Sequence, residues 1–383
     1  MKSLYKIVHL TLLICCFSCG DSNVAQSDDE IIETPEKVIS FYYGADLSYV
    51  NEMLDCGATY KNSDGIVKNP YKIFSEAGTN LVRVRLWHNP TWTNYSNFED
   101  VKLTITKAKA EGMSVLLDFH YSDTWADPAN QEIPAAWLTN INNTTVLSEL
   151  VYNYTYETLN NLASANLLPD IVQVGNEINP MILQHGELKW PIDWVRNSIL
   201  INKGIKAIRA VSKEKNKNIE VMLHIAQPEN GLWWFKDATQ NGITDFDWIG
   251  LSYYPIWSEY KLNNLLTPLK TLVDTYKKRL MIVETAYPFT LENADSANNI
   301  LDSNALVTGY PASEIGQLNY LNKLKEIVKN AGGEGIVYWE PAWVSTSCST
   351  LWGNGSHWDN ATLFDHNNKA TLGMSFYNAS FKE

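Results

Sequence analysis

The sequence predicts a single α/β domain folded as a (β/α)8 barrel, and three observations support this fold class. Eight short apolar runs recur after residue 40, and each is continuous rather than alternating, as expected of strands buried on both faces. Helical stretches separate most of these runs, which favours parallel strands joined by helices. No glycine-rich phosphate loop follows the first run, so the alternative of a doubly wound open sheet lacks support.

The expected elements alternate along the chain. The predicted strands span residues 41–47, 81–87, 114–120, 171–177, 220–225, 247–254, 280–284 and 335–340. The predicted helices span residues 69–77, 100–110, 146–163, 193–211, 262–278 and 314–330. Glycines 78 and 112 follow the first two helices, because glycine readily adopts the left-handed backbone that ends a helix. An average unit of about 43 residues is long for this fold and predicts enlarged loops after several strands.

The N-terminal segment predicts export and a lipid anchor. Lys2 and Lys6 precede an apolar run over residues 7–17, and a small residue then precedes Cys19, which is typical of a bacterial lipoprotein signal. An ordinary secretory signal is the alternative, and the run is too short for a membrane-spanning helix of ~18 residues. We expect an outer-membrane lipoprotein of a Gram-negative-type bacterium, on the surface or the periplasmic face. The predicted parts are a signal peptide at 1–18, a lipidated acidic tether at 19–40 and a catalytic domain at 41–383.

Charge and composition favour a neutral ligand. The net charge of −13 argues against nucleic acid as the main partner. A single tryptophan is most often a core residue, but many of the 14 tryptophans lie at or just beyond predicted strand ends, where aromatic faces suit sugar rings. We expect a monomeric domain. The tryptophans in question are Trp87, Trp92, Trp125, Trp233, Trp234, Trp257, Trp339, Trp343, Trp352 and Trp358.

Two glutamates at strand ends indicate cleavage of a glycosidic bond. Glu177 closes the fourth predicted strand and Glu284 closes the seventh. Active sites of (β/α)8 barrels lie at the carboxyl ends of the strands, and two carboxylates there can serve as proton donor and nucleophile. The alternative for either glutamate alone is a salt-bridged core carboxylate.

The neighbouring residues predict different roles for the two glutamates. Asn176 could bond a hydroxyl beside the reacting carbon, so Glu177 is predicted as the acid/base and Glu284 as the nucleophile. Arg85 is expected to keep the nucleophile ionised, and a tyrosine of the sixth strand to bond it. The two carboxyl groups should then lie about 5–5.5 Å apart, with retention of anomeric configuration. No cofactor is expected for catalysis.

Further polar residues occupy the same strand ends. Any one of them alone is most simply a satisfied structural group, but a whole ring around one barrel mouth suggests a binding site. The members are Asp46, Arg85, Asp118, His120, Asn176, His224, Tyr253, Tyr254 and Trp339.

Several longer strings resemble the endo-β-1,4-galactanases of glycoside hydrolase family 53. The narrowest are His-Tyr-Ser-Asp-Thr-Trp-Ala-Asp-Pro from His120 and Tyr-Trp-Glu-Pro-Ala-Trp from Tyr338. The resemblance implies a retaining barrel enzyme that cleaves β-1,4-galactan, as in pectic side chains and type I arabinogalactan, to galacto-oligosaccharides. It also implies the same two catalytic glutamates. The sugar subsites would be lined by the strand-end ring together with Trp125, Asp127 and Trp257.

Two alternative functions stay open at this point. The strand-end glutamates alone fit a whole clan of endo-glycanases, so a β-mannanase or a β-1,4-glucanase is one alternative. The other is a surface lipoprotein that binds glycan without cutting it, although both carboxylates that cleavage needs are present.

The chain departs from the family pattern in a loop and in its cysteines. Bacterial members that it resembles bind calcium between the loops after strands seven and eight through an Asp-x-His-x-Asn pattern. Here Asp295 and Asn299 remain, with Ala297 in place of the histidine, so a structural calcium or a capped turn is expected. Cys56 and Cys348 follow the first and eighth strands, which are neighbours in a closed barrel. A disulfide between them is a hypothesis that a Cα separation above about 7 Å would exclude.

Overall fold

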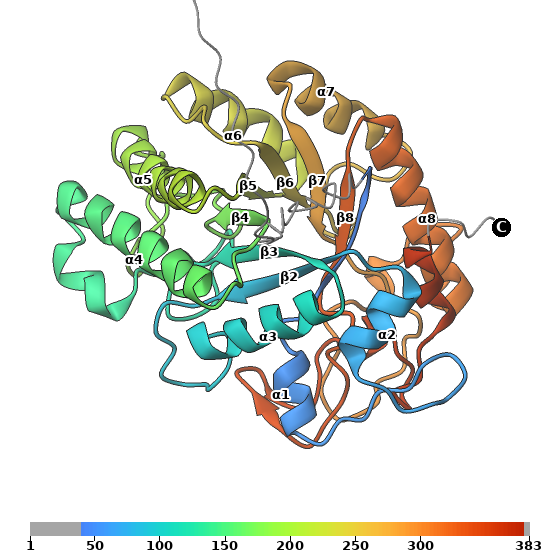
Figure 1. Ribbon diagram of the computed structural model, residues 1–383. Coiled ribbons are helices and arrows are strands. Elements are labelled where there is room, and N and C mark those ends of the chain that lie inside the picture. The colour runs from blue at the N-terminus through green and yellow to red at the C-terminus, as the bar shows by residue number, and fades with distance from the viewer. Residues whose placement is uncertain (1–39, 379–383) are drawn as a thin grey trace, which may run out of the picture. The chain divides into compact units, whose positions relative to one another are not determined.

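The computed structural model describes residues 40–378, which form a closed barrel of eight parallel strands (Figure 1). The strands follow sequence order, and β8 pairs with β1 to close the barrel. The predicted fold class is confirmed, and every predicted strand overlaps an observed one. The strands are β1 (Tyr42–Asp46), β2 (Leu81–Leu86), β3 (Ser114–Phe119), β4 (Ile171–Val174), β5 (Glu220–Ala226), β6 (Trp248–Ser252), β7 (Arg279–Glu284) and β8 (Gly335–Tyr338).

Helices surround the barrel (Figure 1). The prediction omitted α1 and α6. The aromatic run at residues 233–235 obscured α6, because aromatic residues also favour strands. The helices are α1 (Val50–Asp55), α2 (Pro70–Ala77), α3 (Phe98–Ala110), α4 (Thr144–Ser164), α5 (Trp194–Glu214), α6 (Pro228–Gln240), α7 (Leu266–Tyr276) and α8 (Glu314–Asn330).

Strand alternation divides the side chains of the barrel between two environments. In β2 the apolar residues Val82 and Val84 belong to the large apolar core, whereas Arg83 and Arg85 project to the opposite face. Deeper in the barrel the chain makes room for bulky groups: a Cβ on Gly250 would lie 2.8 Å from the sulfur of Met222. Because of the alternation in β2, Arg83 and Arg85 lie on the same face of the strand, and both line the cleft at its carboxyl end.

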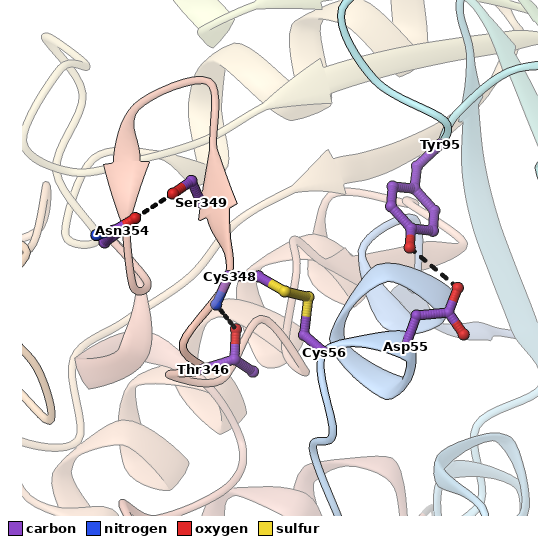
Figure 2. Close-up of a disulfide and its surroundings, with 7 residues drawn as sticks. All are labelled: Asp55, Cys56, Tyr95, Thr346, Cys348, Ser349 and Asn354. Atoms are coloured by element: carbon purple, nitrogen blue, oxygen red, sulfur yellow. Dashed lines mark hydrogen bonds between the residues drawn. A yellow bond between two sulfur atoms is a disulfide. The ribbon is translucent and has the colours of Figure 1, made fainter.

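A disulfide joins the loops that follow β1 and β8 (Figure 2). Cys56, directly after α1, is bonded to Cys348, and their Cα atoms are 5.8 Å apart. The hypothesis of this disulfide is confirmed. The hairpin formed by β9 (Ser349–Thr350) and β10 (Gly353–Asn354) begins next to it.

The predicted signal peptide, the lipid anchor at Cys19 and nearly all of the predicted tether lie outside the described residues. Within residues 40–378, none of the helices combines the length and the hydrophobicity that crossing a membrane requires.

Candidate active site

The carboxyl ends of the strands surround a cleft of about 460 Å³. Glu177 and Glu284 both line it, so the two strand-end glutamates meet at one site as the sequence predicted. Most of the predicted substrate residues line the same cleft. They are Asp46, Arg85, His120, Trp125, Asp127, Asn176, Tyr254, Trp257 and Trp339.

The chain after β4 turns sharply and brings Glu177 into the cleft. Gly175 has a φ of +83°, and a Cβ there would lie 2.5 Å from Cγ2 of Ile178, so only glycine fits. Glu177 itself has a left-handed φ of 44°, which is uncommon for a residue with a side chain. This strained turn is maintained at the point where the carboxyl group is presented.

The surroundings of Glu177 favour its protonated form. Burial raises the pKa of Glu177 to about 7, and the neighbouring Asp127 also raises it. The hydroxyl of Ser252 donates a hydrogen bond to Oε1 and acts in the opposite direction. A carboxyl group with a pKa near neutrality can carry a proton at the pH where it has to transfer one.

Glu284, the last residue of β7, is held by a cation. Its Oε1 lies 2.8 Å from Nη1 of Arg83, and the hydroxyl of Tyr254 donates to Oε2 at 3.5 Å. Burial raises the pKa of Glu284, and the charge of Glu177 raises it further, whereas Arg83 lowers it. The ionised form of Glu284 thus has a direct partner of opposite charge.

Arg83 links side chains from several strands on one side of the cleft. Besides Glu284, its guanidinium bonds Asp46 and Asp118, each at 2.8 Å, and it donates to the side-chain oxygen of Asn176 at 2.7 Å. One buried cation therefore faces three carboxylates. This excess of negative charge favours the uptake of a proton by a neighbouring carboxyl group.

The prediction that Arg85 keeps the nucleophile ionised is wrong, because that position belongs to Arg83. Arg85 instead forms an ion pair with Glu340. Its guanidinium carbon lies 4.4 Å from the ring centroids of Tyr49 and Trp125 and 5.1 Å from that of Trp87. Arg85 still lines the cleft, but it orders aromatic rings there.

Three residues predicted to bind substrate are too deeply buried to do so. Asp118, His224 and Tyr253 each have 0% of their surface exposed, and none lines the cleft. Asp118 bonds Arg83 and lies 3.1 Å from Nε2 of His120. The hydroxyl of Tyr253 donates to a backbone carbonyl. These side chains support the cleft from behind, and the interpretation of all of them as substrate contacts was wrong.

The structure also adds cleft residues to the predicted set. Arg83 was overlooked although strand alternation places it on the same face as Arg85. Gln227, which lies between β5 and α6, and Asn230, in the first turn of α6, had no usable signal because α6 was not predicted. Three tryptophans were noted only as strand-end aromatics, and they line the cleft: Trp343, Trp352 and Trp358.

The comparison with protein families decides the relationship. The sequence profile of glycosyl hydrolase family 53 matches residues 42–377. The chain belongs to glycosyl hydrolase family 53. This family membership agrees with the resemblance that the sequence strings had suggested.

Relatives of this family 53 chain match it over nearly their whole length. It is 54% identical over 346 residues to the arabinogalactan endo-beta-1,4-galactanase of Cellvibrio japonicus, covering 89% of this chain and 92% of the relative. It is 36% identical to the endo-beta-1,4-galactanase of Bacillus subtilis, covering 91% and 84%. Among solved structures, the family 53 catalytic domain of Ignisphaera aggregans superimposes with a TM-score of 0.82 at 30% identity, covering 91% and 98%.

The predicted calcium residues of this family 53 chain lie in a hydrogen-bonded network. Asp295 accepts from the backbone N–H groups of Ala297 and Ser356 at 2.7 and 2.8 Å and from the hydroxyl of Ser345. The side-chain nitrogen of Asn299 donates to Asp359 and to Asn293, each at 2.7 Å, and its buried oxygen lacks a hydrogen-bond partner. Within residues 40–378, no three His, Cys, Asp or Glu side chains cluster as a metal site. Hydrogen-bond donors therefore occupy the carboxylate of Asp295, whereas the side-chain oxygen of Asn299 has no such partner.

Proposed function

We propose that this chain is an endo-acting, retaining glycoside hydrolase that cleaves β-1,4-galactosidic bonds in galactan and type I arabinogalactan and releases galacto-oligosaccharides. The observation that carries the proposal is the contrast between two carboxyl groups on one cleft. Burial raises the pKa of both groups, but their partners differ: Oε1 of Glu284 lies 2.8 Å from the guanidinium of Arg83, whereas Glu177 accepts a hydrogen bond from the neutral hydroxyl of Ser252. The galactanases named among the relatives support galactan as the substrate.

The proposed reaction is a double displacement. The carboxylate of Glu284 attacks the anomeric carbon and the glycosidic C–O bond breaks, while Glu177 gives its proton to the leaving oxygen. Water then attacks the glycosyl-enzyme ester. Glu177 takes up the proton of that water, and Glu284 leaves as a carboxylate. Two inversions at one carbon give net retention.

Arg83 and Tyr254 support the nucleophile in this proposal. Both contact Glu284, so both stabilise its carboxylate before attack and again when the ester breaks down. The tryptophans of the cleft offer apolar faces on which sugar rings can stack.

The decisive experiment is a time course of products from linear β-1,4-galactan, with the anomeric configuration followed by NMR. We expect short galacto-oligosaccharides that retain the β-configuration, and no products from β-mannan or cellulose. Cleavage of mannan or cellulose in preference to galactan would refute the substrate assignment, and initial α-anomers would refute retention.

The catalytic role of Glu284 has a separate test. Glu284→Ala should abolish turnover and still bind galactan in affinity electrophoresis, because the cleft remains. Glu149→Gln, an exposed glutamate paired with Lys203 on the outside of the barrel, is the matched control and should retain full activity. Near-normal activity of the Glu284 variant would contradict the assignment.

We propose the cellular context from the N-terminal sequence. Lys2, Lys6, the apolar run and Cys19 support a signal peptide and a lipid anchor that hold a monomeric catalytic domain at the outer membrane. Radiolabelled palmitate should be incorporated into the wild-type chain and not into Cys19→Ala. Protease treatment of intact cells would then distinguish the surface from the periplasmic face.

A structural calcium between the loops after β7 and β8 stays a prediction. The buried oxygen of Asn299 without a partner is the feature that favours it. A bound ion would stabilise the folded state, so calcium should raise the midpoint of thermal unfolding of chelator-treated protein. An unchanged midpoint at millimolar calcium would remove the ion from the proposal.

A further inference from the structure

A row of buried polar groups stands behind Glu177. The hydroxyl oxygen of Ser252, the last residue of β6, contacts Oε1 of Glu177 on one side and lies 2.8 Å from Nε2 of His224 on the other. Both Ser252 and His224 have 0% of their surface exposed, and neither lines the cleft. The substrate cannot touch them, so they can act on the reaction only through Glu177.

The tautomer of His224 follows from the groups around Nδ1. Burial holds the pKa of His224 well below its usual value, so the ring is neutral and carries one proton. The side-chain nitrogen of Gln173 lies 3.0 Å from Nδ1, and the backbone N–H of Glu177 donates to it at 3.4 Å. Oδ1 of Asn176 lies 2.9 Å away but already accepts from Arg83, and the two hydrogens of the Gln173 nitrogen are directed at Asp118, 2.6 Å away, and at Nδ1. Two donors directed at Nδ1 make it an acceptor, which places the proton on Nε2.

We propose that Ser252 and His224 are positioning residues that decide which oxygen of Glu177 carries the transferable proton. Nε2–H of His224 donates to the oxygen of Ser252, and the hydroxyl of Ser252 is thereby directed to Oε1. Oε1 is then an acceptor, so the proton of the protonated carboxyl group lies on Oε2. Among the described residues, no protein group donates to Oε2, which leaves it available to the leaving oxygen. In this proposal His224 and Ser252 only orient hydrogen bonds, and no proton is transferred between them and Glu177.

The same contact affects the pH dependence. A hydroxyl that donates to Oε1 stabilises the carboxylate and lowers the pKa of Glu177, against the larger effect of burial. Removing the hydroxyl should therefore raise this pKa further, and activity should persist to higher pH. The charged and titratable groups that face Glu177 remain in the variant: Arg83, Asp118, Asp127, His224, Tyr254 and Glu284.

The test compares two substrates that differ in their need for a proton, and it rests on the proposed galactanase function. A galacto-oligosaccharide leaves only when protonated, whereas 2,4-dinitrophenolate leaves from an aryl β-galactobioside without help. Ser252→Ala should lower kcat/KM by about 10- to 100-fold on the oligosaccharide and by less than about threefold on the aryl substrate. The upper pH limit of kcat/KM on the oligosaccharide should also move to higher pH.

Damage to the fold would lower both rates together, so equal losses, or a pH limit that does not rise, would overturn the proposal. If Ser252→Ala does not fold, His224→Gln is judged by the same ratio, since it keeps the hydroxyl and removes the group that directs it. Ser212→Ala, whose hydroxyl donates to the carbonyl of Lys217 far from the cleft, is the control and should change neither rate.

The outcomes also separate the two proposals. If the wild-type protein leaves galactan uncut, the proposed function and the positioning role both fail. If it cuts galactan and the substrate ratio of Ser252→Ala equals that of the wild type, only the positioning role fails.

Discussion

Arg83 and Arg85 leave the same strand two residues apart, yet their guanidinium groups enter regions of opposite character. Arg83 faces three carboxylates, one of them the proposed nucleophile. Arg85 has one carboxylate, Glu340, and is enclosed by three aromatic rings. The first region holds excess negative charge and can take up a proton, whereas the second is balanced and mainly fixes the shape of the cleft.

The difference arises from the tilt of the strands. In the register of the barrel, Asp118 is opposite Arg85, but its carboxylate bonds Arg83. Strands in a closed barrel are tilted and staggered, so side chains inside it meet partners that are not their register neighbours. Two arginines on one face can thus serve different functions.

The largest effect on stability and activity is expected from removing the cation of the first region. Arg83→Met leaves buried carboxylates without their cation, which should lower the free energy of unfolding by about 3–5 kcal/mol. It should also lower kcat on galactan by at least about 100-fold, because the nucleophile loses its preorganised partner. Denaturant unfolding and initial rates check both effects. Arg279→Met, at the opposite end of the barrel, is the control, and equal losses in the two variants would remove the special role of Arg83.

The next largest effect is expected from removing the disulfide near the second region. The disulfide ties the loop that carries Tyr49 to the loop after β8, so Cys56→Ser with Cys348→Ser should lower the free energy of unfolding by about 2–4 kcal/mol. KM for galactan should rise more than kcat falls, because Tyr49 stacks on Trp343 of the cleft at a centroid distance of 4.3 Å. A fall in kcat with KM unchanged would show that the disulfide acts on the first region, around Arg83, instead.

A smaller effect is expected from neutralising the second region. Arg85→Met combined with Glu340→Gln removes both charges, and replacing a buried ion pair in this way often changes stability by less than about 2 kcal/mol. We expect KM to rise severalfold as Trp125 loses its cation, with kcat within about threefold of the wild type. A loss of kcat as large as that of Arg83→Met would abolish the distinction between the two arginines.

The smallest effect is a shift in pH dependence. Glu177 must be protonated to act as an acid, so kcat/KM should fall as pH rises through about 7. Asp127 raises the pKa of Glu177, so Asp127→Asn should move this upper limit to lower pH. A pH series with the galacto-oligosaccharide measures the shift. Movement in the opposite direction would assign the limit to a different group.

The sequence predicted most of the fold and the centre of the site because both depend on local patterns. Continuous apolar runs gave all eight strands, and the ends of two runs identified Glu177 and Glu284. The same patterns did not separate residues that line the cleft from those behind it. Asp118 lies one residue before the end of β3 and His224 two residues before the end of β5, so both are fully buried, whereas His120 follows β3 and lines the cleft.

By itself the sequence determined the barrel, the shared rim of the two glutamates and the family. Periodicity and residue type decide these, since both are properties of short segments. Only the tertiary structure decided that Arg83 rather than Arg85 holds the nucleophile, and that Cys56 meets Cys348. Alternation fixes the face on which a side chain lies, but the tilt and stagger of the closed barrel fix its partner.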